Sequence, residues 1–188
     1  MSETLVAKAS LHQTESTRFK PLVTIAIPTY TRRLLLQRAV ESVLNQTYKN
    51  WELIISDNAS TDDTQAFANN LGDERIRYVR QETNIGLVRN LNAALKQGKG
   101  DFLKPLADDD YLHPEYLKEV IMFLENNQDI GYLSMDSMIV NESGSLLLRR
   151  PTPSSKVYRS KIPLLLHLIF SSDKKRRQVF TPTESLFS

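Results

Sequence analysis

Cysteine is absent from the 188-residue sequence, which excludes a disulfide framework and thiolate metal sites. Any metal ion must therefore be held by oxygen ligands or by one of the three histidines. The formal net charge is only +2, too small to indicate a nucleic-acid-binding protein. Long hydrophobic runs are missing as well, because the longest apolar stretch, residues 162–170, falls short of the ~20 residues that a membrane-spanning helix needs.

The N-terminal residues 1–20 are polar and lack the apolar segment of a secretory signal. We expect them to form a flexible leader, and together with the missing cysteines they favour a reducing, cytoplasmic location. Four basic residues at positions 174–177 follow the apolar stretch 162–170. This arrangement is open to two interpretations: a solvated polar segment, or a patch that holds the chain peripherally against anionic lipid at the inner face of a membrane.

Short apolar runs alternate with amphipathic stretches along the middle of the chain. The runs LVTIAI, WELIIS, IRYV and DFLKPLA predict buried strands, the first of which we expect to stop at Pro28. Apolar residues at helical spacing predict helices over 33–45, 62–71, 85–97 and 115–126. A further strand, IGYLSM, and a hairpin around Gly144 follow. The alternation predicts an α/β domain of three layers, with helices covering a mostly parallel sheet.

Three consecutive carboxylates, Asp108, Asp109 and Asp110, follow the fourth predicted strand and are called the acidic run below. The carboxyl ends of parallel strands form the ligand-binding edge of an open α/β sheet. Carboxylates so close together repel one another, and Mg²⁺ or Mn²⁺ would relieve that repulsion while sharing its coordination with substrate phosphates. The alternative is a solvated loop that places negative charge near a helix N-terminus.

Two other segments end at the same predicted edge of the sheet. Asp57 closes the second strand, where its carboxylate could accept a hydrogen bond from a base or a ribose, or could simply form an Asx-turn. Pro28, Thr29 and Tyr30 end the first strand and by themselves indicate only a turn. Trp51 begins a strand and is expected to pack rather than to stack on a sugar.

Taken together and in order, the motifs IPTYTR, SDNASTDDT, NIGLVRNLNAAL and FLKPLADDDYLHPEYL resemble the family 2 inverting glycosyltransferases, which have a GT-A fold. The resemblance covers about residues 22–140 and implies a Rossmann-like sheet that binds a nucleotide-sugar donor. It further implies transfer of a sugar from a UDP- or dTDP-sugar to a hydroxyl of a glycan or lipid-linked acceptor, as in polysaccharide and cell-envelope biosynthesis.

The resemblance also assigns roles to individual residues. It implies that Pro28, Thr29 and Tyr30 cradle the nucleotide and that Asp57 contacts the base. Asn84, Arg89 and Asn90 match the loop and helix start beside the nucleotide. The acidic run stands at the family's DxD position, where Asp108 is expected to meet the ribose, and Asp109 or Asp110 is expected to hold Mn²⁺ or Mg²⁺ on the diphosphate.

Three departures from the family pattern stand out. Thr31 replaces a common Asn, and Ala107 replaces an Asp or Ser often found before the acidic run. The general base of the family lies on a later segment, and none of Asp136, Asp173 and Glu184 has a convincing context for that role. We therefore expect a donor-binding domain over residues 21–150, followed by an incomplete acceptor-side segment over residues 151–188.

The missing base leaves an alternative to an active glycosyltransferase: a catalytically impaired fragment that still binds the nucleotide sugar. A nucleotidyltransferase is disfavoured, because the loop after its first strand normally contains glycine and IPTYTR has none.

Overall fold

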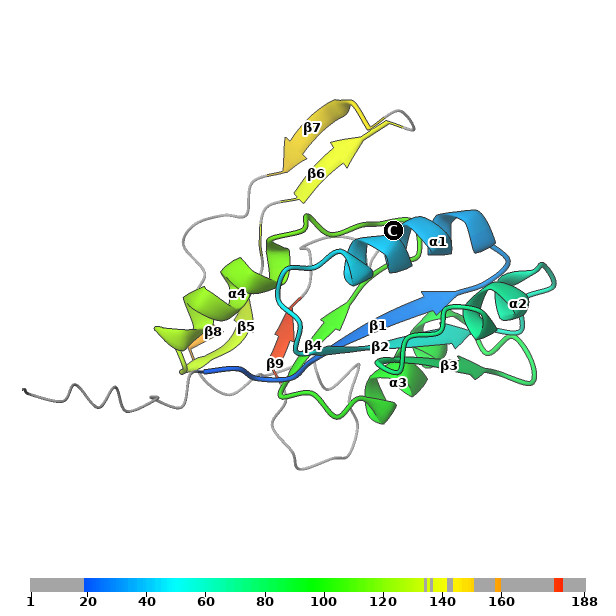
Figure 1. The fold of residues 1–188 in the computed structure, drawn as a ribbon, viewed down its shortest axis with the longest axis horizontal. Helices are drawn as coiled ribbons and strands as arrows, with labels where there is room; N and C mark the ends of the chain where they lie inside the picture. The colour runs from blue at the N-terminus through cyan, green and yellow to red at the C-terminus, as the bar shows by residue number, and fades with distance from the viewer. Residues whose placement is uncertain are drawn as a thin grey trace, which may run out of the picture.

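The computed structural model describes residues 19–133, 135, 137–141, 144–150, 158–159 and 178–180. It contains a seven-stranded sheet with the order β3-β2-β1-β4-β9-β5-β8, and a separate two-stranded hairpin, β6-β7 (Figure 1). All neighbouring pairs in the large sheet are parallel except β5 and β8. The predicted α/β fold with a mostly parallel sheet is thereby confirmed.

The elements alternate along the chain as the sequence predicts. The strands are β1 (Val23–Thr29), β2 (Trp51–Asp57), β3 (Ile76–Arg80), β4 (Phe102–Pro105), β5 (Ile130–Leu133), β6 (Ser137–Val140), β7 (Leu146–Arg150), β8 (Tyr158–Arg159) and β9 (Gln178–Phe180). The helices are α1 (Arg33–Leu44), α2 (Thr64–Asn69), α3 (Leu87–Gln97) and α4 (Tyr116–Glu125). Each predicted helix is present, and α2 is the one shortened most relative to its pattern. Among the described residues, none of the helices has the length and apolar character required to cross a bilayer.

Helices cover both faces of the sheet, which gives the three predicted layers. Alternate residues of β1 point to opposite faces: Ile25 packs in the core beneath α1, α2 and α4, whereas Ala26 packs in a second cluster beneath α3. Figure 1 shows α1 and α4 on one side of the sheet and α3 on the other. Trp51 belongs to the larger core and is 2% exposed, so its predicted packing role is confirmed.

The prediction that the first strand stops at Pro28 is wrong. Pro28 lies inside β1 and pairs with Ser56 of β2. On the other side of β1, the ladder with β4 ends where Ala26 faces Pro105, so the strand loses no pairing with β4 by lacking an N–H at Pro28. The consequence is that β1 continues to Thr29 and carries this side chain to the edge of the sheet.

The strands β8 and β9 are not predicted by the sequence. β9 is a three-residue strand that lies between β4 and β5, and its pairings join Phe102 to Gln178 and Tyr132 to Val179. A segment of three residues is too short to show an alternation of apolar and polar residues. It is a strand only because it pairs with β4 and β5. The hairpin around Gly144 is confirmed, with Gly144 in the left-handed region at φ +80°. The apolar stretch 162–170 and the basic residues 174–177 lie outside the described residues.

Candidate functional site

The order of the strands places a topological switch point between β1 and β4. The chain runs from β1 outward to β2 and β3, and then returns to the other side of β1 as β4. In open α/β sheets, ligands bind beyond the carboxyl ends of the strands at such a point. Register brings three strand ends into one row, in which Thr29 faces Asp57 and Asp57 faces Arg80. The acidic run follows β4 at the same edge.

A buried hydrogen bond joins β1 to the acidic run. The Thr29 hydroxyl donates to Oδ2 of Asp108 over 2.8 Å, and both residues are buried. Burial raises the pKa of Asp108, whereas the Thr29 hydroxyl and the Arg32 guanidinium oppose that rise. Arg32 Nη1 lies 3.3 Å from Oδ1 of Asp108 and 3.3 Å from Oδ2 of Asp109, so one nitrogen serves two carboxylates.

The other members of the acidic run face a different electrostatic environment. Asp109 and Asp110 are exposed at the surface. Partial desolvation and the Asp109 carboxylate raise the pKa of Asp110, and Lys104 opposes this effect. Lys104 is 2% exposed in β4, where burial lowers its pKa to about 8. A buried ammonium group therefore lies close enough to influence the acidic run.

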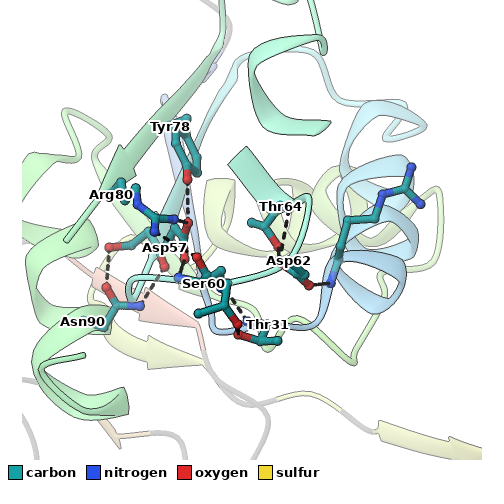
Figure 2. A network of polar contacts seen from close by, with 11 residues as sticks. Thr31, Asp57, Ser60, Asp62, Thr64, Tyr78, Arg80 and Asn90 are labelled. Carbon is teal, nitrogen blue, oxygen red and sulfur yellow. Dashed lines mark hydrogen bonds and ion pairs between the residues drawn. The ribbon is translucent and has the colours of Figure 1, made fainter. Parts of the chain in front are cut away.

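Asp57 is the centre of a hydrogen-bond network at the ends of β2 and β3 (Figure 2). Its side chain is fully buried, and Oδ1 accepts a 2.8 Å bond from the backbone N–H of Ser60. Oδ2 accepts from the Tyr78 hydroxyl at 2.5 Å and from Arg80 Nη1 at 2.7 Å. In this structure the Asp57 carboxylate is therefore not exposed to a nucleotide base. Its contact with the base stays a prediction, and that contact requires one of these partners to move.

The same network connects the loops after β1 and β2. The backbone N–H of Thr31 donates to the Ser60 hydroxyl over 2.8 Å, and Arg80 Nη2 donates to the Ser60 carbonyl over 2.8 Å. Thr31 and Ala59 have positive φ values, 53° and 67°, which non-glycine residues adopt at a cost. These bonds hold the two loops in a strained conformation and thereby fix the shape of the edge.

The third predicted segment contains two asparagines with different roles. Asn84 is exposed, and its Oδ1 accepts from the Asn58 amide at 2.7 Å and from the backbone of Gly86 at 3.0 Å. Asn90 is 1% exposed, and its amide both donates to the Ser56 carbonyl at 2.6 Å and accepts from the Ser56 hydroxyl at 2.7 Å. Asn90 therefore fastens α3 to β2, while its neighbour Arg89 remains exposed.

The remaining predicted residues, Pro28 and Tyr30, lie on either side of Thr29. Pro28 is buried in β1, whereas Tyr30 is 46% exposed. An exposed aromatic ring beside a strand end can stack on the flat face of a base. The structure thus brings the predicted residues of β1, β2 and the acidic run to the carboxyl edge of the sheet. The helix α3 is fastened to β2 through Asn90.

The donor set suits a divalent cation that is delivered together with a substrate. Among the described residues, no three His, Asp or Glu side chains gather into a cluster that could hold a metal by themselves. Mg²⁺ characteristically uses one or two carboxylates, several waters and substrate phosphates. Asp109 and Asp110 fit this pattern because they are exposed carboxylates at the ligand-binding edge.

Sequence reasoning missed two sets of groups around the carboxylates: the side chains of Arg32, Tyr78, Arg80 and Lys104, and the backbone N–H of Ser60 that donates to Asp57. Arg32 and Lys104 lie inside the motifs that carry the resemblance, but neither has a distinctive spacing. Arg80 could have been identified from its position, because it is a basic residue at the end of β3. The neighbouring strand β2 ends in Asp57, so the two residues are adjacent. Identifying that pair requires the strand order, which the sequence does not contain explicitly.

Comparison with known proteins supports the resemblance found in the sequence. The model of the Glycosyl transferase family 2 matches residues 24–172. Similar relatives include the putative glycosyltransferase EpsE of Bacillus subtilis, 32% identical over 127 residues that cover 66% of this chain and 46% of that protein. Another is the GalNAc(5)-diNAcBac-PP-undecaprenol beta-1,3-glucosyltransferase of Campylobacter jejuni, 34% identical over 130 residues that cover 67% of this chain and 41% of that protein.

Solved structures support the same assignment. The crystal structure of S. aureus TarS residues 1–349 in complex with UDP matches with a TM-score of 0.60 and 25% identity, over 71% of this chain and 38% of that one. The chain therefore spans less than half the length of each of these three proteins. Because the family model covers most of the sequence, and the fold matches a GT-A structure, the chain belongs to glycosyltransferase family 2.

Proposed function

We propose that the chain binds a nucleotide-diphosphate sugar, UDP- or dTDP-linked, at the carboxyl edge of β1, β2 and β4. The sugar is transferred with inversion to a hydroxyl of a glycan or lipid-linked acceptor. The observation that carries the proposal is the 2.8 Å bond from Thr29 to Asp108, which unites the first-strand loop and the acidic run at the switch point. The undecaprenol-linked acceptor named for the C. jejuni relative supports the acceptor class.

The residues of the edge would share the work of donor binding. Pro28 and Thr29 shape the loop, and the exposed ring of Tyr30 stacks on the base. Asp57 reaches the base if Tyr78 or Arg80 yields its bond, and otherwise positions the loop that contains Ser60.

On the other side of the nucleotide, Asn84 and Arg89 offer exposed polar groups. Asn90 sets the position of Arg89 by fastening α3 to β2, and the Asn58 amide holds Asn84. The ribose would be recognised by Asp108, whose carboxylate is oriented by the Thr29 hydroxyl. Asp109 and Asp110 would hold Mn²⁺ or Mg²⁺ against the diphosphate.

The reaction requires stabilisation of the departing diphosphate and removal of a proton from the acceptor. Bound to the diphosphate oxygens, Mn²⁺ or Mg²⁺ would supply positive charge for the leaving group. The acceptor hydroxyl attacks the anomeric carbon from the face opposite the diphosphate, which inverts the configuration. A carboxylate is the expected general base. None of the residues assigned above has that role, because all of them belong to the donor side.

The domain layout forms part of the same proposal. Residues 21–150 form the donor-binding domain, residues 1–20 a leader, and residues 151–188 belong to the acceptor side. The alternative is a catalytically impaired donor-binding fragment. Peripheral contact with a membrane through residues 162–170 and 174–177, at its cytoplasmic face, is compatible with either.

Calorimetric titration of UDP, dTDP and GDP, with and without Mn²⁺, tests the proposal. We expect metal-dependent binding of one nucleotide, and loss of the metal dependence in Asp109→Ala or Asp110→Ala. Asp63→Asn is the matched control, because Asp63 is an exposed carboxylate whose ion pair, 3.6 Å to Arg33, does not include a member of the acidic run. Unchanged metal dependence in both acidic-run variants would refute the metal assignment.

A second variant and an activity assay separate the remaining alternatives. Asp57→Ala should weaken nucleotide binding and preserve its metal dependence, whereas unaltered affinity would reduce Asp57 to a turn residue. Donor hydrolysis or transfer by the chain would exclude the impaired fragment. Binding without turnover would support it.

A further inference from the structure

Two arginines contact aspartates at the edge of the sheet, and the geometries of their contacts differ. Arg80 uses both Nη atoms at short distances, 2.7 Å to Asp57 and 2.8 Å to the carbonyl of Ser60. Arg32 places one nitrogen 3.3 Å from each of Asp108 and Asp109. Strong charge-assisted bonds of this kind are roughly 2.7–2.9 Å long, so the Arg32 contacts are weak and exchangeable.

Arg32 places its positive charge between two carboxylates of the acidic run. Oδ1 of Asp108 and Oδ2 of Asp109 both converge on Nη1 of Arg32. The Asp109 carboxylate is also one of the proposed metal ligands. A divalent cation bound there would repel the guanidinium and compete for the same oxygen. The ion pair between Arg32 and Asp109 and the bond between Asp109 and the metal therefore weaken each other.

Arg32 has the freedom and the chemistry to move elsewhere. Its side chain is 53% exposed, and it occupies the residue immediately before α1, at the end of the first-strand loop. A guanidinium binds phosphate oxygens through a planar fork of donors and stays charged at any pH relevant to the protein. The diphosphate of a donor would lie beside this residue if the acidic run holds its metal.

We propose that Arg32 is an internal counter-ion of the acidic run that transfers to the donor diphosphate when metal and nucleotide bind. The inference rests on the proposed function, because it uses the donor site assigned there. Without metal, Arg32 offsets the repulsion between Asp108 and Asp109. With the metal–nucleotide complex in place, Arg32 becomes a diphosphate-binding residue.

The test uses Arg32→Gln, which keeps a polar, though shorter, side chain and removes the charge. Binding of Mn²⁺ alone should tighten by about two- to fivefold, the fold-change expected for losing a competing, partly exposed ion pair. Binding of UDP with Mn²⁺ should weaken by about fivefold or more, because a charged contact to the diphosphate is lost. Binding of uridine, which has no phosphate, should stay unchanged.

Arg33→Gln is the matched control, since Arg33 lies next in the chain but contacts Asp63 at 3.6 Å and the Phe67 ring at 5.1 Å. It should change neither Mn²⁺ nor UDP affinity. Opposite signs for Mn²⁺ and UDP in Arg32→Gln support the transfer. Unchanged affinities, or weakening of both, would overturn it. If the unsubstituted protein binds no nucleoside diphosphate, the proposed function fails, and an unchanged Mn²⁺ affinity in Arg32→Gln would separately overturn the counter-ion role.

Discussion

Lys104 gives the clearest physical prediction, because a lysine in an apolar strand carries a charge that burial opposes. The residue is 2% exposed, and burial lowers its pKa from 10.5 to about 8, while Asp110 acts in the opposite direction. At 1.36 kcal/mol per unit of pKa, this fall corresponds to about 3 kcal/mol of destabilisation when the ammonium is present. Its Nζ lies 5.2 Å from the Tyr116 ring centroid, and this cation–π contact recovers about 1 kcal/mol.

The perturbation is Lys104→Met, which replaces the side chain by an unbranched apolar one that is one atom shorter. At pH 7 we expect the variant to be more stable than the unsubstituted protein by about 2–3 kcal/mol. Below pH 8 the lysine is protonated in both states, so the full penalty applies. Between pH 8 and pH 10.5 the folded state releases its proton first, so the stability of the unsubstituted protein rises relative to the variant. Above pH 10.5 both states are neutral and the advantage of methionine disappears.

Urea unfolding at a series of pH values measures this difference directly. Titrating groups that Lys104 does not influence are common to both proteins, so their contributions cancel when the free energies of unfolding are subtracted. Lys96→Met provides a control, because Lys96 is exposed in the last turn of α3 and its replacement should change the free energy of unfolding only slightly. A Lys104→Met difference that stays flat from pH 7 to pH 10.5 would refute the reasoning.

Three further predictions concern the framework of the site. Thr31→Asn or Ala59→Gly should raise the free energy of unfolding by about 0.5–1 kcal/mol, because Asn and Gly adopt positive φ more easily; unchanged urea midpoints would contradict the assigned strain. In a spectrophotometric titration, Tyr78 should ionise near pH 12, and Asp57→Asn should lower that value. The Tyr78 stabilisation is present below pH 10 and is lost as pH rises to about 12, so a normal tyrosine titration would exclude the buried bond. Asn90→Ala should cost about 1–3 kcal/mol in urea unfolding by leaving partner groups on β2 unpaired, and a near-neutral effect would show that water replaces them.

The layers of the fold could be predicted because local patterns reflect burial faithfully. The helical stripe of α1 includes its four buried residues, and the apolar run of β2 reflects a strand covered on both faces. Two outcomes required tertiary information. Pro28 remains in β1 because the adjacent ladder with β4 has already ended, and β9 exists only through its pairings with β4 and β5.

The acidic members of the candidate site could also be predicted, whereas most of their partners could not. Carboxylates at strand ends are visible in the sequence as an Asp after an apolar run. Their partners lie far away in sequence: Thr29 is 79 residues from Asp108, and Tyr78 is 21 residues from Asp57. Pairing of this kind follows from strand order and register, and a one-residue slip would turn each side chain to the other face.

Burial divides the residues of the candidate site into a frame held by protein hydrogen bonds and a set of exposed groups. Thr29, Asp57, Asn90 and Asp108 are buried and satisfied by protein hydrogen bonds, so changing their partners would cost free energy before any ligand is bound. Successive residues of a helix point about 100° apart, so the anchoring of Asn90 to β2 turns exposed Arg89 away from the sheet. The exposed groups, among them Arg89, Tyr30, Arg32 and Asp109, can therefore adapt to a ligand while the buried ones hold the edge in place. On this argument, substitutions in the frame should lower stability together with nucleotide affinity, whereas substitutions among the exposed groups should change affinity alone.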